Sequence, residues 1–184
     1  MKKIFSLRFV ILVTFIIFLC VLIYHAPKLF STKTGKSTDR MTPEKNTDTG
    51  IVFSITDGDT IWVTIDGKNE PVRLIGIDSP ELETDVTKEA CYSREAKNRM
   101  IELIKNQTIR LESDPSQDNR DKYERLLRYI FLSDGRNINE IMVREGYAWE
   151  YTFLGRKYAY YEEFSNAEKS AKSARLGIWS EECK

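Results

Sequence analysis

Short β-branched segments closed by turn dipeptides constrain the fold of this chain more than any other feature. Three such segments come first, at residues 51–56, 60–65 and 72–77. Turn dipeptides Asp57-Gly58 and Asp66-Gly67 lie between them, so the pattern predicts a three-stranded antiparallel meander. The meander should end at Asp78-Ser79-Pro80, because proline cannot donate a hydrogen bond to a ladder.

The rest of the chain predicts two more strands and three helices. The strands are expected at residues 108–111 and 126–132, and the helices at residues 89–105, 137–145 and 158–175. Five short strands with inserted and appended helices favour an α+β domain built on a small closed barrel of the OB type. We therefore expect a five-stranded OB-type β-barrel with three helices over residues 51–184.

The N-terminus has a different character. Residues 9–24 are almost wholly apolar, and Lys2, Lys3 and Arg8 precede them. With residues 4–7 the run reaches about 20 residues, which is the length of a membrane-spanning helix. We expect a transmembrane signal-anchor at residues 1–26, a flexible polar linker at 27–50 and a domain outside the cytoplasm, because the positive flank stays inside. A cleavable signal peptide is the alternative, and the domain would then be secreted.

Histidine is nearly absent, which excludes much common chemistry. The only histidine, His25, lies just after the apolar run. A Ser-His-Asp or Cys-His site needs a histidine inside the folded domain, and zinc sites usually need histidine or clustered cysteine. Any general base must therefore be a carboxylate, a lysine or a tyrosine.

The formal net charge of zero hides an uneven distribution. Residues 1–50 carry 8 basic and 3 acidic side chains, which leaves 20 basic and 25 acidic side chains in residues 51–184. A net charge of −5 is not the basic footprint of a strong nucleic-acid binder. Either any affinity for nucleic acid is local and assisted by a metal ion, or nucleic acid is not the ligand.

Two cysteines, Cys91 and Cys183, lie outside the apolar run. Outside the cytoplasm such a pair favours a disulfide, which would link the C-terminus to the first predicted helix. Two unrelated free thiols are the alternative.

The candidate site residues come from three stretches: DGDT at 57–60, RLIGIDSPE at 73–81 and DKYERLLRY at 121–129. They supply the carboxylates of Asp59, Asp78 and Glu81 and the guanidiniums of Arg73 and Arg125. Carboxylates on turn-prone backbone suit Ca²⁺, and paired arginines suit phosphate oxygens. This combination is the minimum needed to cut nucleic acid.

Strand geometry can bring the two aspartates together. Asp59 begins one predicted strand and Asp78 ends the next, and these ends are neighbours in an antiparallel pair. Two such carboxylates repel unless a cation lies between them, and the backbone carbonyl of Ser79 could add a neutral ligand. The alternative is that Asp57 and Asp59 only shape a turn.

The remaining candidates would act on water and phosphate. Glu81 could orient or deprotonate an attacking water molecule, and Arg73 and Arg125 could stabilise charge that develops on phosphorus. Lys122 and Tyr123 lie beside Arg125 and could contact substrate phosphate. Surface salt bridges are the alternative explanation for each arginine.

The three stretches, in this order and spacing, resemble the thermonuclease family, typified by staphylococcal nuclease. The resemblance covers about residues 51–181 and includes YSREAK, NEIMVREGYA and the terminal GIWSE. It implies an OB-type barrel with three helices and a Ca²⁺-dependent endonuclease acting on DNA and RNA. It also implies products with a 5′-hydroxyl and a 3′-phosphate.

The resemblance also implies roles for individual residues. Asp59 and Asp78 match calcium carboxylates, and Ser79 matches a residue that offers its backbone carbonyl. Arg73, Glu81 and Arg125 match the catalytic residues, and Lys122 and Tyr123 match substrate contacts. Glu124 departs from the pattern, which has glycine there, and glycine allows backbone angles that glutamate resists. The tyrosines of the family's substrate pocket cannot be matched.

Three functions remain open on the sequence alone. The first is a membrane-tethered, monomeric Ca²⁺-dependent nuclease that faces outward. The second is a non-catalytic OB-fold module that binds nucleic acid or protein, and the third is a structural Ca²⁺-binding surface domain. All five key side chains are present, which favours catalysis.

Overall fold

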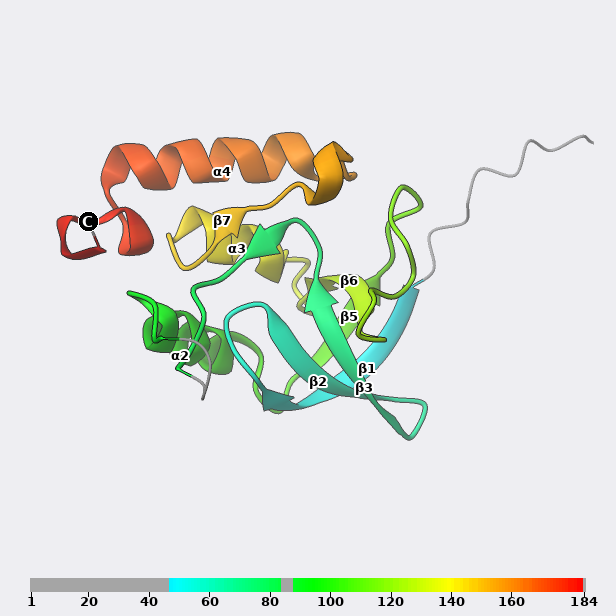
Figure 1. Cartoon of the computed structure of the whole chain (residues 1–184). Helices are drawn as coiled ribbons and strands as arrows, with labels where there is room; N and C mark the ends of the chain where they lie inside the picture. Colours follow the sequence, from blue (N-terminus) through cyan, green and yellow to red (C-terminus); the bar gives the residue numbers. More distant parts are fainter. Residues whose placement is uncertain (1–46, 84–87, 184) are drawn as a thin grey trace, which may run out of the picture. The chain divides into compact units, whose positions relative to one another are not determined.

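Five strands close into a barrel in the computed structural model, which describes residues 47–83 and 88–183 (Figure 1). The strands are β1 (Thr47–Ile55), β2 (Thr60–Ile65), β3 (Lys68–Leu74), β5 (Thr108–Glu112) and β6 (Leu126–Phe131). Their order is β1-β2-β3-β6-β5, and β5 pairs with β1 to close the barrel. Only the β3–β6 pair in this barrel is parallel. The five-stranded barrel predicted from the sequence is confirmed.

Alternation along the strands separates the core from the outer face of the barrel. Val52, Ile61, Val63 and Val72 point inward and are fully buried. Their neighbours in sequence point outward, because successive side chains of a strand lie on opposite faces. The outer face therefore carries exposed residues such as Trp62.

The structure confirms the three predicted helices, α2 (Ser93–Ile104), α3 (Ile138–Arg144) and α4 (Tyr161–Ala174). In Figure 1, α4 lies on the opposite side of α3 from the barrel, and α2 lies beside the barrel. Asn137 caps α3 by accepting hydrogen bonds from the backbone N–H groups of Asn139 and Glu140. The buried side chain of Asn139 then bonds the Ile75 carbonyl and the Ile130 N–H, which fixes α3 against the strand ends.

The predicted third strand at 72–77 is wrong in its bounds. β3 already begins at Lys68 and ends at Leu74, and the next residues turn away at Gly76, which has a φ of 78°. Residues 77–78 form a separate strand, β4 (Ile77–Asp78), which pairs with β7 (Trp149–Glu150). A Cβ at Gly76 would lie 2.6 Å from the Tyr158 ring, so glycine is required for this turn.

The barrel also starts earlier than the predicted domain boundary at residue 51. β1 begins at Thr47, because residues 47–50 pair with β5. These four residues therefore belong to the barrel rather than to the expected linker.

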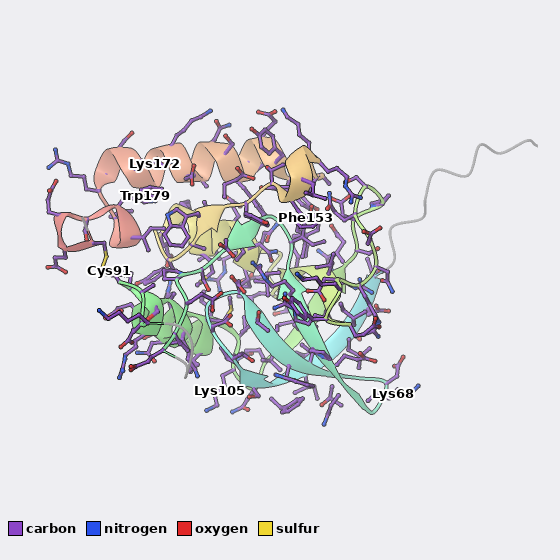
Figure 2. All side chains as sticks on the ribbon, in the orientation of Figure 1. Lys68, Cys91, Lys105, Phe153, Lys172 and Trp179 are labelled. Carbon is purple, nitrogen blue, oxygen red and sulfur yellow. A yellow bond between two sulfur atoms is a disulfide. The ribbon has the colours of Figure 1, made fainter. Side chains whose placement is uncertain are left out.

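The C-terminus is joined to the start of α2. Two 3₁₀ helices, η2 (Gly177–Trp179) and η3 (Glu181–Cys183), follow α4. Cys183 forms a disulfide with Cys91, with the two Cα atoms 5.5 Å apart (Figure 2). These are the two cysteines that the sequence analysis paired.

No helix within residues 47–83 and 88–183 is long and apolar enough to cross a membrane. The expected anchor at residues 1–26 and the linker up to residue 46 lie outside the described residues.

Candidate functional site

A hydrogen-bonded turn fixes Asp59 at the start of β2. The Asp57 carboxylate accepts hydrogen bonds from the backbone N–H groups of Asp59, at 2.9 Å, and Thr60, at 2.7 Å. This turn brings the chain close to Ser79, since a Cβ on Gly58 would lie 2.7 Å from the Ser79 Cβ. The Ser79 N–H in turn donates to the Asp59 carboxylate at 2.7 Å. The buried Asp59 side chain is thus held from two segments of the chain.

Arg73 joins the two predicted calcium carboxylates. Its Nε lies 3.1 Å from Asp59 Oδ1, and one terminal nitrogen lies 2.7 Å from Asp78 Oδ1. The other terminal nitrogen donates to the carbonyls of Leu74 and Ile77. Only 14% of the Arg73 side chain is exposed, and its positive charge is paired with the two carboxylates.

Negative charge accumulates at this point. Burial raises the pKa of Asp57 to about 7, and the neighbouring Asp59 carboxylate adds to the rise. Burial also raises the pKa of Asp78, where Arg73 opposes the shift and Asp59 and Glu81 reinforce it. Glu81 is exposed, and its charge is close enough to disfavour ionisation of Asp78. The site therefore has more carboxylate charge than Arg73 compensates.

Arg125 reaches the same network from the segment before β6. One of its terminal nitrogens donates to Thr60 Oγ1 at 3.2 Å, and the Thr60 hydroxyl donates to Asp59 Oδ1 at 3.0 Å. Asp121 positions Arg125 through a 2.7 Å bond from Nε and a 3.0 Å bond from the backbone N–H. Sequence reasoning missed Asp121, although its spacing of four residues from Arg125 was a usable signal.

A cavity of about 520 Å³ lies beside these residues. Arg73, Asp78 and Arg125 line it, together with the predicted substrate contacts Lys122 and Tyr123. The Lys122 ammonium lies 4.8 Å from the centre of the Tyr123 ring, and both side chains are exposed. Cations and an aromatic ring on one wall suit a ligand that combines phosphate with a planar base.

Two aromatic residues on the cavity wall were not singled out as site residues from the sequence. Tyr151 is 43% exposed and Phe153, which begins η1 (Phe153–Gly155), is 49% exposed. Their ring centres are 6.5 Å apart (Figure 2 labels Phe153). The dense aromatic composition after residue 149 was visible in the sequence, but its irregular backbone gave no period from which exposure could be predicted.

The predicted site residues thus fall into three groups. Asp59, Asp78, Arg73 and Arg125 are connected through hydrogen bonds and ion pairs, with Thr60 as a link. Ser79 forms the second group and contacts Asp59 through its N–H. Glu81, Lys122 and Tyr123 form the third group, whose side chains are exposed. Across residues 47–83 and 88–183, no three Asp, Glu, His or Cys side chains converge as a metal site. Two carboxylates would supply only part of the roughly six to eight oxygen ligands that an ion such as Ca²⁺ takes.

Comparison with known proteins identifies one family model and several nucleases that this chain is similar to. The family model described as "Staphylococcal nuclease homologue" matches residues 71–181. The thermonuclease of Staphylococcus hyicus is 34% identical over 151 residues, which cover 82% of this chain and 87% of that protein. Two Bacillus subtilis proteins, the SPbeta prophage-derived endonuclease YokF and endonuclease YncB, are 38% and 37% identical over 67% of this chain. The chain spans only 41% and 58% of their respective lengths.

Proposed function

The chain belongs to the staphylococcal nuclease family, and from that membership we propose that it is an endonuclease that hydrolyses phosphodiester bonds of DNA and RNA. The observation that carries this proposal is the connected network of Asp78, Arg73, Asp59, Thr60 and Arg125. It offers carboxylates for a cation and guanidiniums for phosphate oxygens in one place, beside a cavity of nucleotide size.

Ca²⁺ is the cation we propose, because the donor atoms are hard oxygens. Asp59 and Asp78 both contact the Arg73 guanidinium, so their carboxylates face a common point. Repulsion by Asp59 and Glu81 raises the pKa of the partly buried Asp78 further, and an added cation would relieve it. The Ser79 carbonyl and water would complete the ligand set. When bound, the ion would supply charge stabilisation for phosphate and for an attacking water molecule.

The chain's own residues have distinct proposed roles. Arg73 and Arg125 hold the non-bridging phosphate oxygens and stabilise the charge that develops there. Glu81 orients or deprotonates the water molecule that attacks phosphorus. Lys122 and Tyr123 hold a neighbouring phosphate at the cavity. Cleavage of the P–O5′ bond then leaves a 3′-phosphate and a 5′-hydroxyl, as the family resemblance implies.

We place the domain outside the cytoplasm, tethered to the membrane by residues 1–26 or secreted if that segment is cleaved. Two observations support this location. Basic residues precede the apolar run, and such a flank stays in the cytoplasm. The Cys91–Cys183 disulfide also fits, since disulfides persist in oxidising compartments. One chain supplies the whole network, which agrees with a monomeric enzyme.

The competing function is a non-catalytic module that binds nucleic acid or protein on the same barrel. Such a module has no need for two arginines and two carboxylates joined through Thr60. Retention of this network favours the nuclease.

Chelation tests the proposed function. Single-stranded DNA is incubated with the full chain in excess EGTA, and we expect cleavage to stop and to return when free Ca²⁺ is restored. EGTA saturated with Ca²⁺ beforehand is the matched control, and circular dichroism checks that the fold persists. Cleavage that continues at full rate in EGTA would contradict the calcium requirement, and no cleavage under either condition would contradict the nuclease.

A further inference from the structure

An exposed strip of apolar side chains crosses the outer face of three strands of the barrel. Phe53 in β1 is 42% exposed and Trp62 in β2 is 38% exposed, and their ring centres are 6.4 Å apart. Pro71 in β3, which is partly buried, is the register partner of Trp62, and cross-strand partners share a face. We call Phe53, Trp62 and Pro71 the aromatic strip.

The aromatic strip continues the same face that carries the candidate site. Thr60 pairs with Arg73, and the next pair on this face of β2 and β3 is Trp62 with Pro71. Residues two apart on a strand are separated by roughly 6.6–6.8 Å. The aromatic strip therefore begins two residues along β2 and β3 from the Thr60–Arg73 pair. Both residues of this pair contact Asp59, and Thr60 also contacts Arg125.

The cavity lies on the other side of Arg73. Its lining continues from Arg73 in β3 through the turn at Gly76 to Asp78 in β4, and includes neither Trp62 nor Phe53. Along β3, Arg73 thus separates the cavity from the aromatic strip. A linear polymer held at Arg73 by one phosphate would extend toward both.

Away from Arg73, the residues next to the aromatic strip on its own face are uncharged. Ile51 and Ser54 beside it on β1, and Thr64 and Asn69 beyond it on β2 and β3, carry no charge. Residues 51–184 carry an excess of five acidic side chains, but the β2–β3 pairs on this face, from Thr60–Arg73 to Thr64–Asn69, include no carboxylate, so they do not repel a polyanion. Aromatic faces without cations favour the base of a nucleotide over its phosphate.

We propose that the aromatic strip is a second base-binding subsite, on the opposite side of the scissile phosphate from the cavity. This inference rests on the proposed nuclease function. Trp62 stacks on a base of a single-stranded substrate, with Phe53 beside it. A single strand is required, because paired bases are stacked on one another and do not offer a free face. Stacking of this kind tolerates any base, so the subsite contributes affinity rather than sequence preference.

The test separates the base from the backbone. KM is measured for the full chain and for Trp62→Ala on an eight-nucleotide oligothymidylate and on an abasic oligomer with the same phosphodiester backbone. Loss of one base stack should raise the KM for the oligothymidylate roughly tenfold in Trp62→Ala, and should leave the KM for the abasic oligomer unchanged. Trp62→Leu should behave like the alanine variant, and Trp62→Phe should retain most of the affinity.

A matched control and the contrary outcomes make the test decisive. Leu176→Ala removes a 41% exposed apolar side chain in the turn after α4 and should not change either KM. An unchanged KM for oligothymidylate in Trp62→Ala would overturn the inference, and so would an equal rise on both substrates. An unchanged KM, together with a shift of tryptophan emission by phosphatidylcholine vesicles that is lost in Trp62→Ala, would assign the aromatic strip to a lipid surface and overturn the inference. Failure of the unmodified chain to cleave either oligomer would instead remove the proposed nuclease itself.

Discussion

Glu124 shows how a single residue can sit against its own backbone preference. It has a φ of 62°, in the left-handed region that favours glycine. The turn around it aims Arg125, since Asp121 accepts hydrogen bonds from the Arg125 N–H and side chain and the Asp121 carbonyl accepts one from the Glu124 N–H. The thermonuclease pattern that this sequence resembles has glycine at this position. The hydrogen bonds between Asp121 and Arg125 form with glutamate at this position, whose left-handed backbone is strained.

We predict that Glu124→Gly is more stable than Glu124→Ala by about 1 kcal/mol, because alanine keeps the left-handed penalty and glycine does not. Both variants remove the same carboxylate, so their difference isolates the backbone. The free energies of unfolding are measured in urea at pH 7. Equal stabilities would show that position 124 carries no strain.

At the residue scale, the sequence identified the site residues whose chemical groups suit a cation or a phosphate. Asp59 was predicted because a carboxylate on turn-prone backbone suits a cation, and Arg73 because paired arginines suit phosphate oxygens. Tyr151 and Phe153 could not be predicted, because exposed and buried aromatics look alike without a regular period.

At the scale of elements, a buried carboxylate joins parts of the chain that are distant in sequence. Asp114 follows β5, and its carboxylate accepts hydrogen bonds from the Tyr129 hydroxyl in β6, at 2.5 Å, and from the Ala159 N–H before α4, at 2.7 Å. It also accepts from the Ser116 N–H. Burial alone would raise the pKa of Asp114, but these hydrogen bonds outweigh it and lower the pKa below its usual value.

The lowered pKa gives Asp114 a defined effect on acid stability. The ionised carboxylate stabilises the fold above about pH 4, and that contribution is lost as the pH falls through the folded-state pKa. Asp114→Asn should lower the free energy of unfolding by about 2 kcal/mol at pH 7, and the difference from the unmodified chain should shrink toward pH 2. Urea unfolding across this range measures it, with the exposed Asp118→Asn as control. A difference that stays constant with pH would contradict the ionised network.

Element boundaries show why periodic patterns predict some structure and miss the rest. The helices were predicted because their apolar residues recur at helical spacing. β3 was misplaced because its first half, Lys68–Pro71, is polar and its apolar continuation passes through Gly76 into β4. The β4–β7 pair was missed because each strand has two residues, too short for any alternation. The parallel β3–β6 pair depends on tertiary closure, which no local pattern encodes.

At the scale of the whole molecule, closure of the barrel assembles the candidate site. β2 contributes Thr60, β3 contributes Arg73, β4 contributes Asp78, and the segment before β6 contributes Arg125. The parallel pairing of β3 with β6 brings Arg125 to Thr60, although the two residues are 65 positions apart. The proposed function thus requires the complete barrel, and the aromatic strip lies on the same outer face.

The most direct test is the rate of single-stranded DNA cleavage by Glu81→Gln and Arg125→Ala in saturating Ca²⁺. Glu83→Gln and Arg136→Ala are the matched controls, since both residues are exposed and have no proposed role. If one centre performs the chemistry, each of the first two variants cleaves at least ~100-fold more slowly than the unmodified chain, while both controls keep its rate. Near-normal cleavage by Glu81→Gln and Arg125→Ala would contradict the account.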